Sequence, residues 1–497
     1  MHVSFLLQRN FAYVGHQLVR LLKDTYGVEK FSAYVSQRRS YDFLKSQKEI
    51  NYSILLLDED VHERYKTENL DPAYLDKLEK DYGIPFLWHF LALDRVLMFN
   101  QLVREYPHHT PRFSHEEMLR MIQVHAKAII EFLEKEKPDA ICFSLVSNLG
   151  SSLLYHIAKK KGIRTLLIHP TTIKHTYIVS DQYDSFTGVS DVFEHRKKHE
   201  IHDKHTERAQ RFLQEFRDKP EPYYTTASPK TQPVSRKDQM GFLKPSRILR
   251  NSKLLASYFY NHYSKPDRKD YDYISPWNYL RDSAKRKLRN LRGINGLYDT
   301  VDLSEDFVFF PLQYEPEITT MLYAPYFADQ LNLARQIAKS IPVRYKLYIK
   351  EHPAMVVYRP RRFYEELKKI PNVKLVQPNI MSFDLTRKAK LITTITSTAG
   401  WEASLLKKPV ISFGTVFYNQ LSFVRQCKAL EELPRLVKEQ LEAFSFDETE
   451  LLHFLSALFE ESATVNLQYI WEEEQDMEKK KEGLTALAAL IAKKLGL

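Results

Sequence analysis

Short apolar runs alternate with amphipathic stretches along roughly the first third of the chain. The apolar runs have the length of buried strands and lie at residues 2–7, 53–57, 140–146 and 164–169. The stretches with helical spacing lie at residues 13–22, 114–136 and 151–161. Ser114 and Glu117 form a predicted capping box, and Gly162 can end the last of these helices. Strands that alternate with helices across short connections predict a parallel sheet covered by helices.

The same alternation returns in the second half of the chain. Predicted strands lie at residues 307–311, 346–350, 373–376, 391–395 and 410–413. Predicted helices between them lie at residues 326–340, 361–369, 380–388 and 401–406. Charged helical patterns with several prolines occupy residues 193–293, and a helical tail begins near residue 448.

We therefore expect an α/β protein of two doubly wound, Rossmann-type domains that face each other across a cleft, with a helical insertion. The predicted boundaries give an N-terminal domain at 1–190 and a C-terminal domain at 301–435. A helical basic insertion at 191–300 would connect them. The C-terminal helices at 436–497 are expected to pack back on the N-terminal domain.

Composition narrows the chemistry that such a protein can use. The chain of 497 residues has 13 glycines and 2 cysteines, and the cysteines are far apart in sequence. A disulfide framework and a cysteine-based zinc site are therefore excluded, and a bound anion must be held by helix N-termini and side chains. The first apolar run is too short for a signal peptide, and no apolar stretch is long enough to span a membrane. These features predict a cytoplasmic protein.

The positive charge of the chain is concentrated in one segment. The formal net charge is +10, and residues 230–292 alone contain 16 Lys and Arg against 5 Asp and no Glu. Aromatic residues such as Tyr258 and Trp277 interleave with these charges. This pattern suits an anionic membrane surface or a phosphate-bearing acceptor, with nucleic acid as the competing partner that we do not expect. A solvated helical insertion with a basic face explains the charges equally well.

Two turns at the predicted edge of the second sheet carry the candidate chemistry. Ligands of open parallel sheets bind beyond the carboxyl ends of the strands. One strand delivers Lys350 and the His352–Pro353 turn to this edge. Another delivers Ser397, Thr398, Ala399 and Gly400 directly before a helix. We interpret them as neighbouring strand–helix units that meet around one ligand.

The second turn has the features of an anion site. The first amides of a helix lack partners and the helix dipole is positive there, so Ser397 and Thr398 could bind phosphate without a glycine-rich loop. Glu402, in the first turn of that helix, could accept hydrogen bonds from ribose hydroxyls. Either turn alone would be read as an N-cap or a simple turn. Their combination predicts a nucleotide site.

These segments resemble a known family. The stretches YKLYIKEHP (345–353), ITSTAGWEA (395–403) and KPVISFGTVFY (408–418) are similar to the capsule polysaccharide biosynthesis family, which includes the β-Kdo transferases of capsule and O-antigen assembly. The stretch PLQYEPE (311–317), with Gln330 in the next helix, fits the same pattern. The resemblance covers about residues 305–420 well and the N-terminal half only in layout.

The resemblance implies a GT-B glycosyltransferase that uses a nucleotide sugar, with Kdo or a related CMP-activated acid sugar as the leading donor. It places His352 and Pro353 at the donor phosphate, and adds Gln313 to the nucleotide-binding residues. The acceptor would be a surface polysaccharide or a lipid-linked glycan. Lys350 would assist departure of the nucleotide. Cationic and N–H donors can stabilise that charge without a metal, so no metal site and no cofactor are expected.

The general base is expected near the N-terminal domain, and the sequence leaves several candidates. Acidic residues at strand ends are Asp58, Glu59 and Asp60, together with Glu315 and Glu317 of the C-terminal domain. The histidine candidates are His16 and His169. Of all these, Asp58, Asp60 and Glu317 are the ones we assign to catalysis, together with His352 and Lys350.

Three other functions compete with glycosyl transfer. One is transfer of a polyol phosphate from a CDP-alcohol, as in teichoic acid polymerases, and another is 2-epimerisation of a UDP-sugar. The third is a scaffold without activity that binds polysaccharide or nucleic acid through residues 230–292. The site residues in the second half argue against a scaffold, since a scaffold does not require them.

Overall fold

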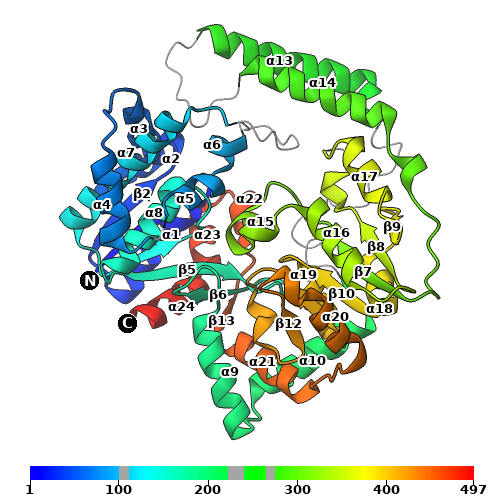
Figure 1. Cartoon of the computed structure of the whole chain (residues 1–497). Coiled ribbons are helices and arrows are strands. Elements are labelled where there is room, and N and C mark those ends of the chain that lie inside the picture. The colour runs from blue at the N-terminus through cyan, green and yellow to red at the C-terminus, as the bar shows by residue number, and fades with distance from the viewer. Residues whose placement is uncertain (85, 100–110, 222–239, 265–274, 357) are drawn as a thin grey trace.

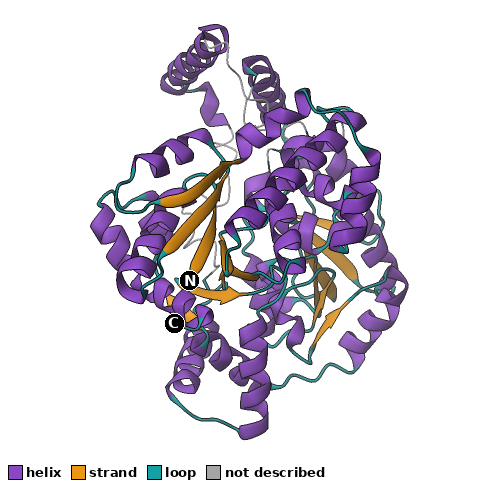
Figure 2. Cartoon of the chain, turned by 90° about the vertical axis from the view of Figure 1, so that its left-hand side faces the viewer, coloured by secondary structure: helices purple, strands orange, loops and turns teal. Residues whose placement is uncertain are grey.

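The computed structural model describes residues 1–84, 86–99, 111–221, 240–264, 275–356 and 358–497. These residues form two α/β halves, each built around its own sheet (Figure 1). Helices cover both faces of the sheets, as the view in Figure 2 shows. The sheets are parallel except at one edge of the first. The structure thus confirms the predicted α/β fold class of two doubly wound, GT-B-like halves.

The first sheet has the strand order β13-β6-β5-β4-β1-β2-β3. Its strands are β1 (His2–Leu7), β2 (Lys30–Val35), β3 (Tyr52–Leu57), β4 (Ala140–Phe143), β5 (Arg164–Pro170), β6 (Thr176–Ser180) and β13 (Ser462–Thr464). The first five run parallel, whereas β6 and β13 are antiparallel additions at the edge. In the register of the sheet, Phe5 of β1 lies between Ala33 and Cys142.

Helices of the first half cover both faces of this sheet. They are α1 (Phe11–Tyr26), α2 (Arg38–Ser46), α3 (Asp58–Glu63), α4 (Pro72–Tyr82), α5 (Trp88–Leu93), α6 (Arg95–Phe99), α7 (His115–Glu136) and α8 (Leu149–Lys160). The capping box before α7 is present, with Ser114 Oγ accepting from Glu117 N at 3.3 Å and Glu117 Oε2 accepting from Ser114 N at 2.7 Å. Gly162 after α8 has the left-handed backbone conformation predicted for it, with φ of 75°.

The second sheet has the strand order β12-β11-β10-β7-β8-β9. Its strands are β7 (Phe307–Pro311), β8 (Lys346–Lys350), β9 (Val373–Val376), β10 (Leu391–Thr394), β11 (Val410–Ser412) and β12 (Val424–Gln426). Its helices are α15 (Ile318–Tyr323), α16 (Gln330–Ser340), α17 (Arg361–Lys368), α18 (Ser382–Lys388), α19 (Thr398–Leu405) and α20 (Leu433–Glu442).

Both faces of the second sheet are buried. Phe307 and Phe309 of β7 point into one apolar cluster, whereas Val308 and Phe310 point into another on the opposite face. Helices on both sides explain why β7 is an uninterrupted apolar run rather than an alternating one.

The remaining helices connect the halves and complete them. They are α9 (Thr187–His199), α10 (Lys204–Asp218), α13 (Pro245–Ser264), α14 (Pro276–Arg292), α21 (Glu448–Glu460), α22 (Leu467–Glu472), α23 (Met477–Gly483) and α24 (Thr485–Leu495). The helices α23 and α24 pack on α1 of the first half, where Leu487 and Ile491 join its apolar cluster. The helices α9 and α10 pack on α21, with the buried Arg196 bound to Asp203 and Glu460 at 2.7 and 2.6 Å.

The basic segment is described at 240–264 and 275–292, and the rest of it lies outside the described residues. Its helices α13 and α14 lie side by side and project from the molecule (Figure 1). The ring of Phe259 packs edge-on against Trp277 at 4.9 Å, and Tyr258 packs against Tyr279 at 5.0 Å. We call this pair of helices the hairpin.

The halves meet through α15, which follows the carboxyl end of β7. Arg95 Nη1 donates to the carbonyl oxygen of Pro316 at 3.3 Å, and Tyr323 stacks on Tyr183 with a centroid distance of 6.2 Å. Met321 and Leu322 belong to an apolar cluster of the first half. The carboxyl edge of the second sheet is therefore turned toward the first half.

Candidate functional site

The strand order of the second sheet locates its ligand-binding position. From β7 the chain runs outward through β8 and β9, and then crosses back to add β10, β11 and β12 on the other side. Ligands of such sheets bind where the direction of strand addition reverses, which here is between β7 and β10. Our expectation that the His352 and Ser397 turns belong to neighbouring units was wrong, because β7 lies between β8 and β10.

The His352 turn begins as β8 ends. His352 caps a short 3-10 helix, Pro353–Met355, and its Nδ1 accepts a hydrogen bond from Ala354 N at 3.2 Å. Since Nδ1 is the acceptor, the neutral ring carries its proton on Nε2. Burial lowers the pKa of His352, and the nearby Glu351 carboxylate opposes that shift. The turn therefore holds a neutral imidazole with Nε2–H as a donor.

The Ser397 turn begins α19 on the other side of β7. Ser397 is the N-cap residue, and its Oγ accepts from Ala399 N at 3.0 Å. Its carbonyl oxygen accepts from the Tyr418 hydroxyl at 2.8 Å. A Cβ on Gly400 would lie 2.4 Å from that hydroxyl, so only glycine fits there without a shift. The first turn of α19 is thus fixed from behind, and its amides start a helix at the carboxyl edge.

Gln313 joins the two sides of the reversal point. Following β7, its Oε1 accepts from Thr396 N at 2.8 Å and its Nε2 donates to Thr396 Oγ1 at 3.0 Å. Gln330 holds the backbone of Gln313 by hydrogen bonds of 2.7 and 3.1 Å. The strand that separates the two turns therefore supplies the side chain that orients one of them.

Lys350, at the end of β8, and Glu402, in α19, lie close together. Lys350 is buried and its Nζ donates to Ser382 Oγ at 2.8 Å. Burial lowers the pKa of Lys350 to about 8, and the negative charge of Glu402 opposes this shift. Glu402 is itself buried, but the prediction that it lies in the first turn was wrong, because α19 begins at Thr398 and its first turn contains no acidic residue. The structure thus places Lys350 of β8 and Glu402 of α19 within electrostatic reach of each other.

A buried arginine supports the His352 turn, and the sequence did not single it out. Arg359 is 1% exposed and bonds the Glu351 carboxylate, while its Nη2 lies 3.3 Å from Glu315 Oε2 and donates to the carbonyl oxygen of Gln313 at 2.7 Å. Burial lowers the pKa of Arg359, but the Glu351 and Glu315 carboxylates raise it by more. Glu315, a candidate base, is thereby bound to this arginine.

Glu317 lies at the contact between the halves. It precedes α15, and burial raises the pKa of its carboxyl group although the positive charge of Arg95 opposes the shift. A carboxyl group with a raised pKa at this position is suited to moving a proton.

The acidic candidates of the first half are in two different environments. Asp58 is 2% exposed, and its Oδ1 accepts from Tyr34 at 2.5 Å and contacts His125 Nε2 at 3.0 Å. Asp60 is partly exposed and forms an ion pair with Arg38 at 2.5 Å. Burial lowers the pKa of His125, but the hydrogen bond and charge of Asp58 raise it by more. Asp58 is thus held inside the first half, whereas Asp60 is accessible to solvent.

The remaining candidates from the sequence, His169, His16 and Glu59, are buried within the first half. His169 Nε2 contacts the carbonyl oxygen of Gln182 at 3.0 Å, and His16 Nδ1 contacts the Tyr52 hydroxyl at 3.1 Å. Burial lowers the pKa of each of these histidines to about 4. Glu59 is 7% exposed at the start of α3.

The first sheet has a reversal point of its own, between β1 and β4. Gln8 follows β1, and Ser144 and Ser147 follow β4. Ser144 Oγ donates to Gln8 Oε1 at 3.2 Å, and Gln8 Nε2 donates to Ser147 Oγ at 3.5 Å. Sequence reasoning missed these polar residues, because only the strand order shows that the ends of β1 and β4 are adjacent.

Two further observations, on metal binding and on membrane spans, concern only the part of the chain that the structure describes. No cluster of three or more His, Cys, Asp or Glu side chains is arranged to hold a metal ion there. None of the helices in those ranges is long and apolar enough to cross a membrane.

A model of a known protein family matches the part of the chain that contains the residues at this edge. The family model described as "Capsule polysaccharide biosynthesis protein" matches residues 204–457, which is more than half of the chain. The chain belongs to this family. The matched region contains the second sheet with both turns and Gln313, and confirms the resemblance seen in the sequence.

One curated protein matches a short part of the chain. Protein FixF of Sinorhizobium fredii is 34% identical over 129 residues, which are 24% of this chain and 30% of FixF. The chain thus matches less than a third of the length of that relative.

Two solved structures have a related layout. The β-Kdo 2,7 transferase of Thermosulfurimonas dismutans KpsC is 12% identical with a TM-score of 0.35, and the match covers 76% of this chain and 97% of that one. The UDP-GlcNAc 2-epimerase of Methanocaldococcus jannaschii, in complex with UDP-GlcNAc and UDP, is 12% identical with a TM-score of 0.27, and the match covers 93% and 99%. Both values are too low to transfer a substrate or a residue role.

Proposed function

We propose that this capsule-family protein is a glycosyltransferase. It would move a sugar from a nucleotide donor, with Kdo or a related CMP-activated acid sugar as the leading choice, to a surface polysaccharide or lipid-linked glycan. The observation that carries the proposal is the convergence of three donor groups at one sheet edge. These are the His352 imidazole, the Lys350 ammonium and the first amides of α19 behind Ser397.

In the proposed reaction, the bond between the anomeric carbon and the nucleotide phosphate breaks, and negative charge develops on the departing phosphate. The hydroxyls of Ser397 and Thr398 would bind its oxygens at the start of α19. The amides of Ala399 and Gly400 donate to Ser397 Oγ and to the Ser397 carbonyl oxygen, and they would exchange these bonds for phosphate oxygens. His352 Nε2–H would donate from the other side of β7, and Pro353 fixes the turn that presents it. Donors fixed before the reaction stabilise such charge without a reorganisation cost.

Lys350 and Glu402 complete the donor site. Lys350, charged below a pKa of about 8, would add a positive charge to the departing phosphate. Glu402 would face the ribose, and Gln313 would hold the turn between them. We propose that these groups act without a metal or a cofactor, so transfer should be unchanged after treatment with EDTA.

The acceptor hydroxyl would be deprotonated from the side of the first half. Glu317 is the favoured base because it lies where the halves meet and its pKa is raised by burial. Asp58 and Asp60 remain alternatives, with Asp60 the more accessible. A carboxylate is an effective base when its pKa approaches the working pH.

We also propose a peripheral position on the inner face of the cytoplasmic membrane. None of the described residues of α13 is buried, and Ile248, Leu249, Tyr260 and Tyr263 are each more than half exposed. Exposed apolar side chains beside lysines and arginines suit the surface of an anionic bilayer.

Thermal stabilisation by nucleotides tests the proposal. A ligand that binds only the native state raises the melting temperature, so purified protein is heated with CMP, CDP, UDP, GDP or ADP. Stabilisation selective for CMP is expected. Selectivity for CDP would instead indicate polyol-phosphate transfer, and UDP a hexose donor or an epimerase. Stabilisation by none of the five would contradict the nucleotide site and favour a scaffold.

A further inference from the structure

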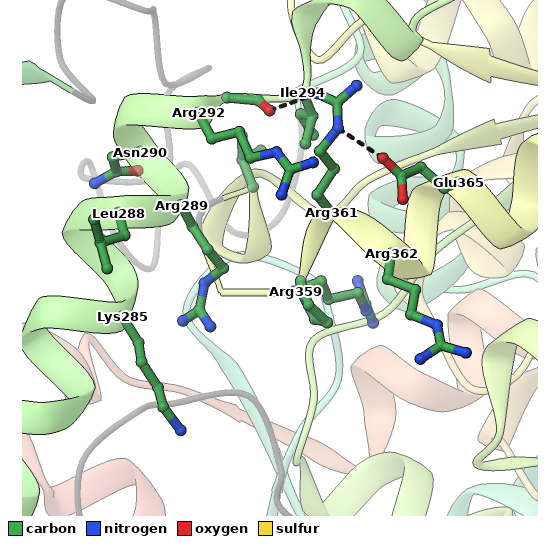
Figure 3. A pocket seen from close by; sticks show the side chains of 13 residues that line it. Lys285, Leu288, Arg289, Asn290, Arg292, Ile294, Arg359, Arg361, Arg362 and Glu365 are labelled. Atoms are coloured by element: carbon green, nitrogen blue, oxygen red, sulfur yellow. Dashed lines mark hydrogen bonds and ion pairs between the residues drawn. The ribbon is translucent and has the colours of Figure 1, made fainter.

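A cavity lies outside the candidate nucleotide site. It has a volume of about 400 Å³ and lies between α14 of the hairpin and the segment that starts α17 (Figure 3). Neither the two turns nor Lys350 lines it. Its lining contains six cationic side chains and one carboxylate, Glu365; the cations are Lys285, Arg289, Arg292, Arg359, Arg361 and Arg362.

One wall is a single face of α14. Lys285, Arg289 and Arg292 are spaced by four and three residues, which places them on the same side of the helix. Like charges at this spacing destabilise a helix, so an anion between them would remove an unfavourable interaction. Figure 3 shows Arg289 extending from α14 into the space between this helix and Arg359.

The opposite wall is rigid and is also cationic. Arg361 Nε donates to Glu365 Oε1 at 2.8 Å, and its Nη1 donates to the carbonyl oxygen of Gly293 at 3.0 Å. Arg359 is fixed from behind by Glu351 and Glu315. Within the described residues, Lys285, Arg292 and Arg362 have no carboxylate at ion-pair distance. The positive charge of this cavity is therefore only partly compensated by the protein.

We infer that this cavity binds a phosphate ester. A phosphate presents several acceptor oxygens to cations on different sides, whereas one arginine can satisfy both oxygens of a carboxylate. Arginine is well suited to phosphate because its planar guanidinium binds two oxygens at once. The volume lies within the usual range of small-molecule sites, about 300–1,000 Å³.

The exposed leucines of α14 indicate where such a phosphate comes from. Leu288 lines the cavity and is 64% exposed, and Leu291 on the same helix is 47% exposed. An anion next to solvent-exposed apolar side chains is the chemistry of a lipid headgroup. This source rests on the proposed function, since it makes the ligand the phosphate end of a lipid-linked acceptor.

One loop connects the cavity with the candidate nucleotide site. Val356 and Arg359, which follow the His352 turn, form part of its lining, and Arg286 of α14 donates to the Tyr358 hydroxyl at 3.3 Å. A ligand held here would therefore contact the same loop that presents His352.

Calorimetric titration of the full chain tests the site with two probes, glycerol 3-phosphate and dihexanoyl phosphatidylglycerol below its micelle concentration. The cavity variant is Lys285→Glu/Arg289→Glu. The matched control is Lys77→Glu/Lys80→Glu, which makes the same charge change on exposed residues of α4, far from the hairpin in sequence. Each lost charged hydrogen bond corresponds to about tenfold in affinity, so the cavity variant should bind at least tenfold more weakly and the control within about twofold.

The outcomes separate the alternatives. Lipid binding at least tenfold tighter than glycerol 3-phosphate supports the site with a lipid headgroup as ligand, and equal binding supports it with a soluble phosphate ester. No saturable binding by the unaltered chain, or equal loss in both variants, overturns it. If the cavity variant does not fold, Arg362→Glu at the exposed side replaces it. Titration with nucleotides is separate, so a failed proposed function would not be mistaken for a failed cavity.

Discussion

Gln313, at the end of β7, holds Thr396, at the end of β10, by hydrogen bonds of 2.8 and 3.0 Å from one side-chain amide. The two residues are separated by 83 positions in the chain. This contact fixes the two strands at the point where the sheet reverses its direction of strand addition. It makes Gln313 a residue that positions the Ser397 turn.

Replacing Gln313 with Ala should weaken nucleotide binding at least tenfold, because the Thr396 amide loses its acceptor and the turn becomes mobile. The measurement is nucleotide titration by calorimetry. Gln336→Ala, on the outer face of α16, is the control and should bind as the unaltered chain does. Nucleotide affinity within twofold of normal in Gln313→Ala would show that the turn needs no such support.

His352→Ala should weaken nucleotide binding and remove transfer, because Nε2–H is lost from the phosphate side. His352→Asn, which retains a side-chain amide near the Nδ1 position, should keep the turn folded but should still lose transfer. Ser397→Ala is expected to have a similar effect through the other turn. Transfer assays with radiolabelled donor measure this, and normal activity in both His352→Ala and Ser397→Ala would contradict the site assignment.

The pH dependence of transfer should report Lys350. Its pKa is lowered to about 8 by burial, so the ammonium is present below that pH and is lost above it. The rate should therefore fall as pH rises through about 8. Lys350→Arg should retain activity and move this fall to higher pH, since arginine stays charged. Lys350→Met should be inactive across the range; an unchanged pH profile in Lys350→Arg would assign the fall to another group.

Removing Arg359 should destabilise the protein strongly. Its guanidinium is the partner of two carboxylates, and Arg359→Met would leave Glu351 buried without a positive charge. Breaking a buried pair costs about 3–5 kcal/mol. Urea unfolding measures the loss, and Arg359→Met/Glu351→Gln should recover part of it. An equal loss in the double variant would mean that packing, not charge, is what Arg359 provides.

Acid should destabilise the first half through His169. Its pKa is lowered from 6.5 to about 4 by burial, so the unfolded chain binds the proton more readily as pH falls below 6.5. Stability is therefore complete above pH 6.5 and decreases toward pH 4, by about 2 kcal/mol at pH 5. His169→Gln should reduce the difference in unfolding free energy between pH 7 and 5 by that amount. The exposed His202→Gln should leave it unchanged, and no change in His169→Gln would contradict the buried neutral ring.

The parallel strands β7 to β11 of the second half could be predicted from sequence because both faces of the sheet are buried, whereas the three-residue edge strand β12 was missed. Burial of Phe307 through Phe310 produces a run that reads as a strand without knowledge of its partners. The strand β2 was missed because Ser32 and Tyr34 interrupt its apolar pattern. The structure pairs it with β1 and β3, and Ser32 Oγ contacts His2 Nε2 at 2.9 Å. The short β13 joins β6 from nearly 300 residues away, which no local pattern indicates.

At the candidate site, the two turns could be predicted from the sequence, but the buried side chains that hold them in place could not. Lys350 ends a strand, and His352 and Ser397 lie in the turns that follow strands, so the position of these residues could be predicted from the order of elements. The burial of Arg359 could not, because it lies in the basic run RPRR (359–362), which reads as a solvated surface. The pairing of Asp58 with His125 depends on the packing of α7 over the end of β3, which is a tertiary property.

The two sheets repeat the same order in their parallel cores, since β3-β2-β1-β4-β5 corresponds to β9-β8-β7-β10-β11. Each sheet therefore reverses its direction of strand addition at the equivalent position. Gln8 lies at this position in the first half and Gln313 in the second. Under the proposed function, this assigns the two substrates to two separate sheets. Loops after β1 and β4 can diverge in evolution to accept a new glycan without disturbing the donor loops. A chimera that exchanges only the first half between family members would then change the product's linkage and keep its sugar.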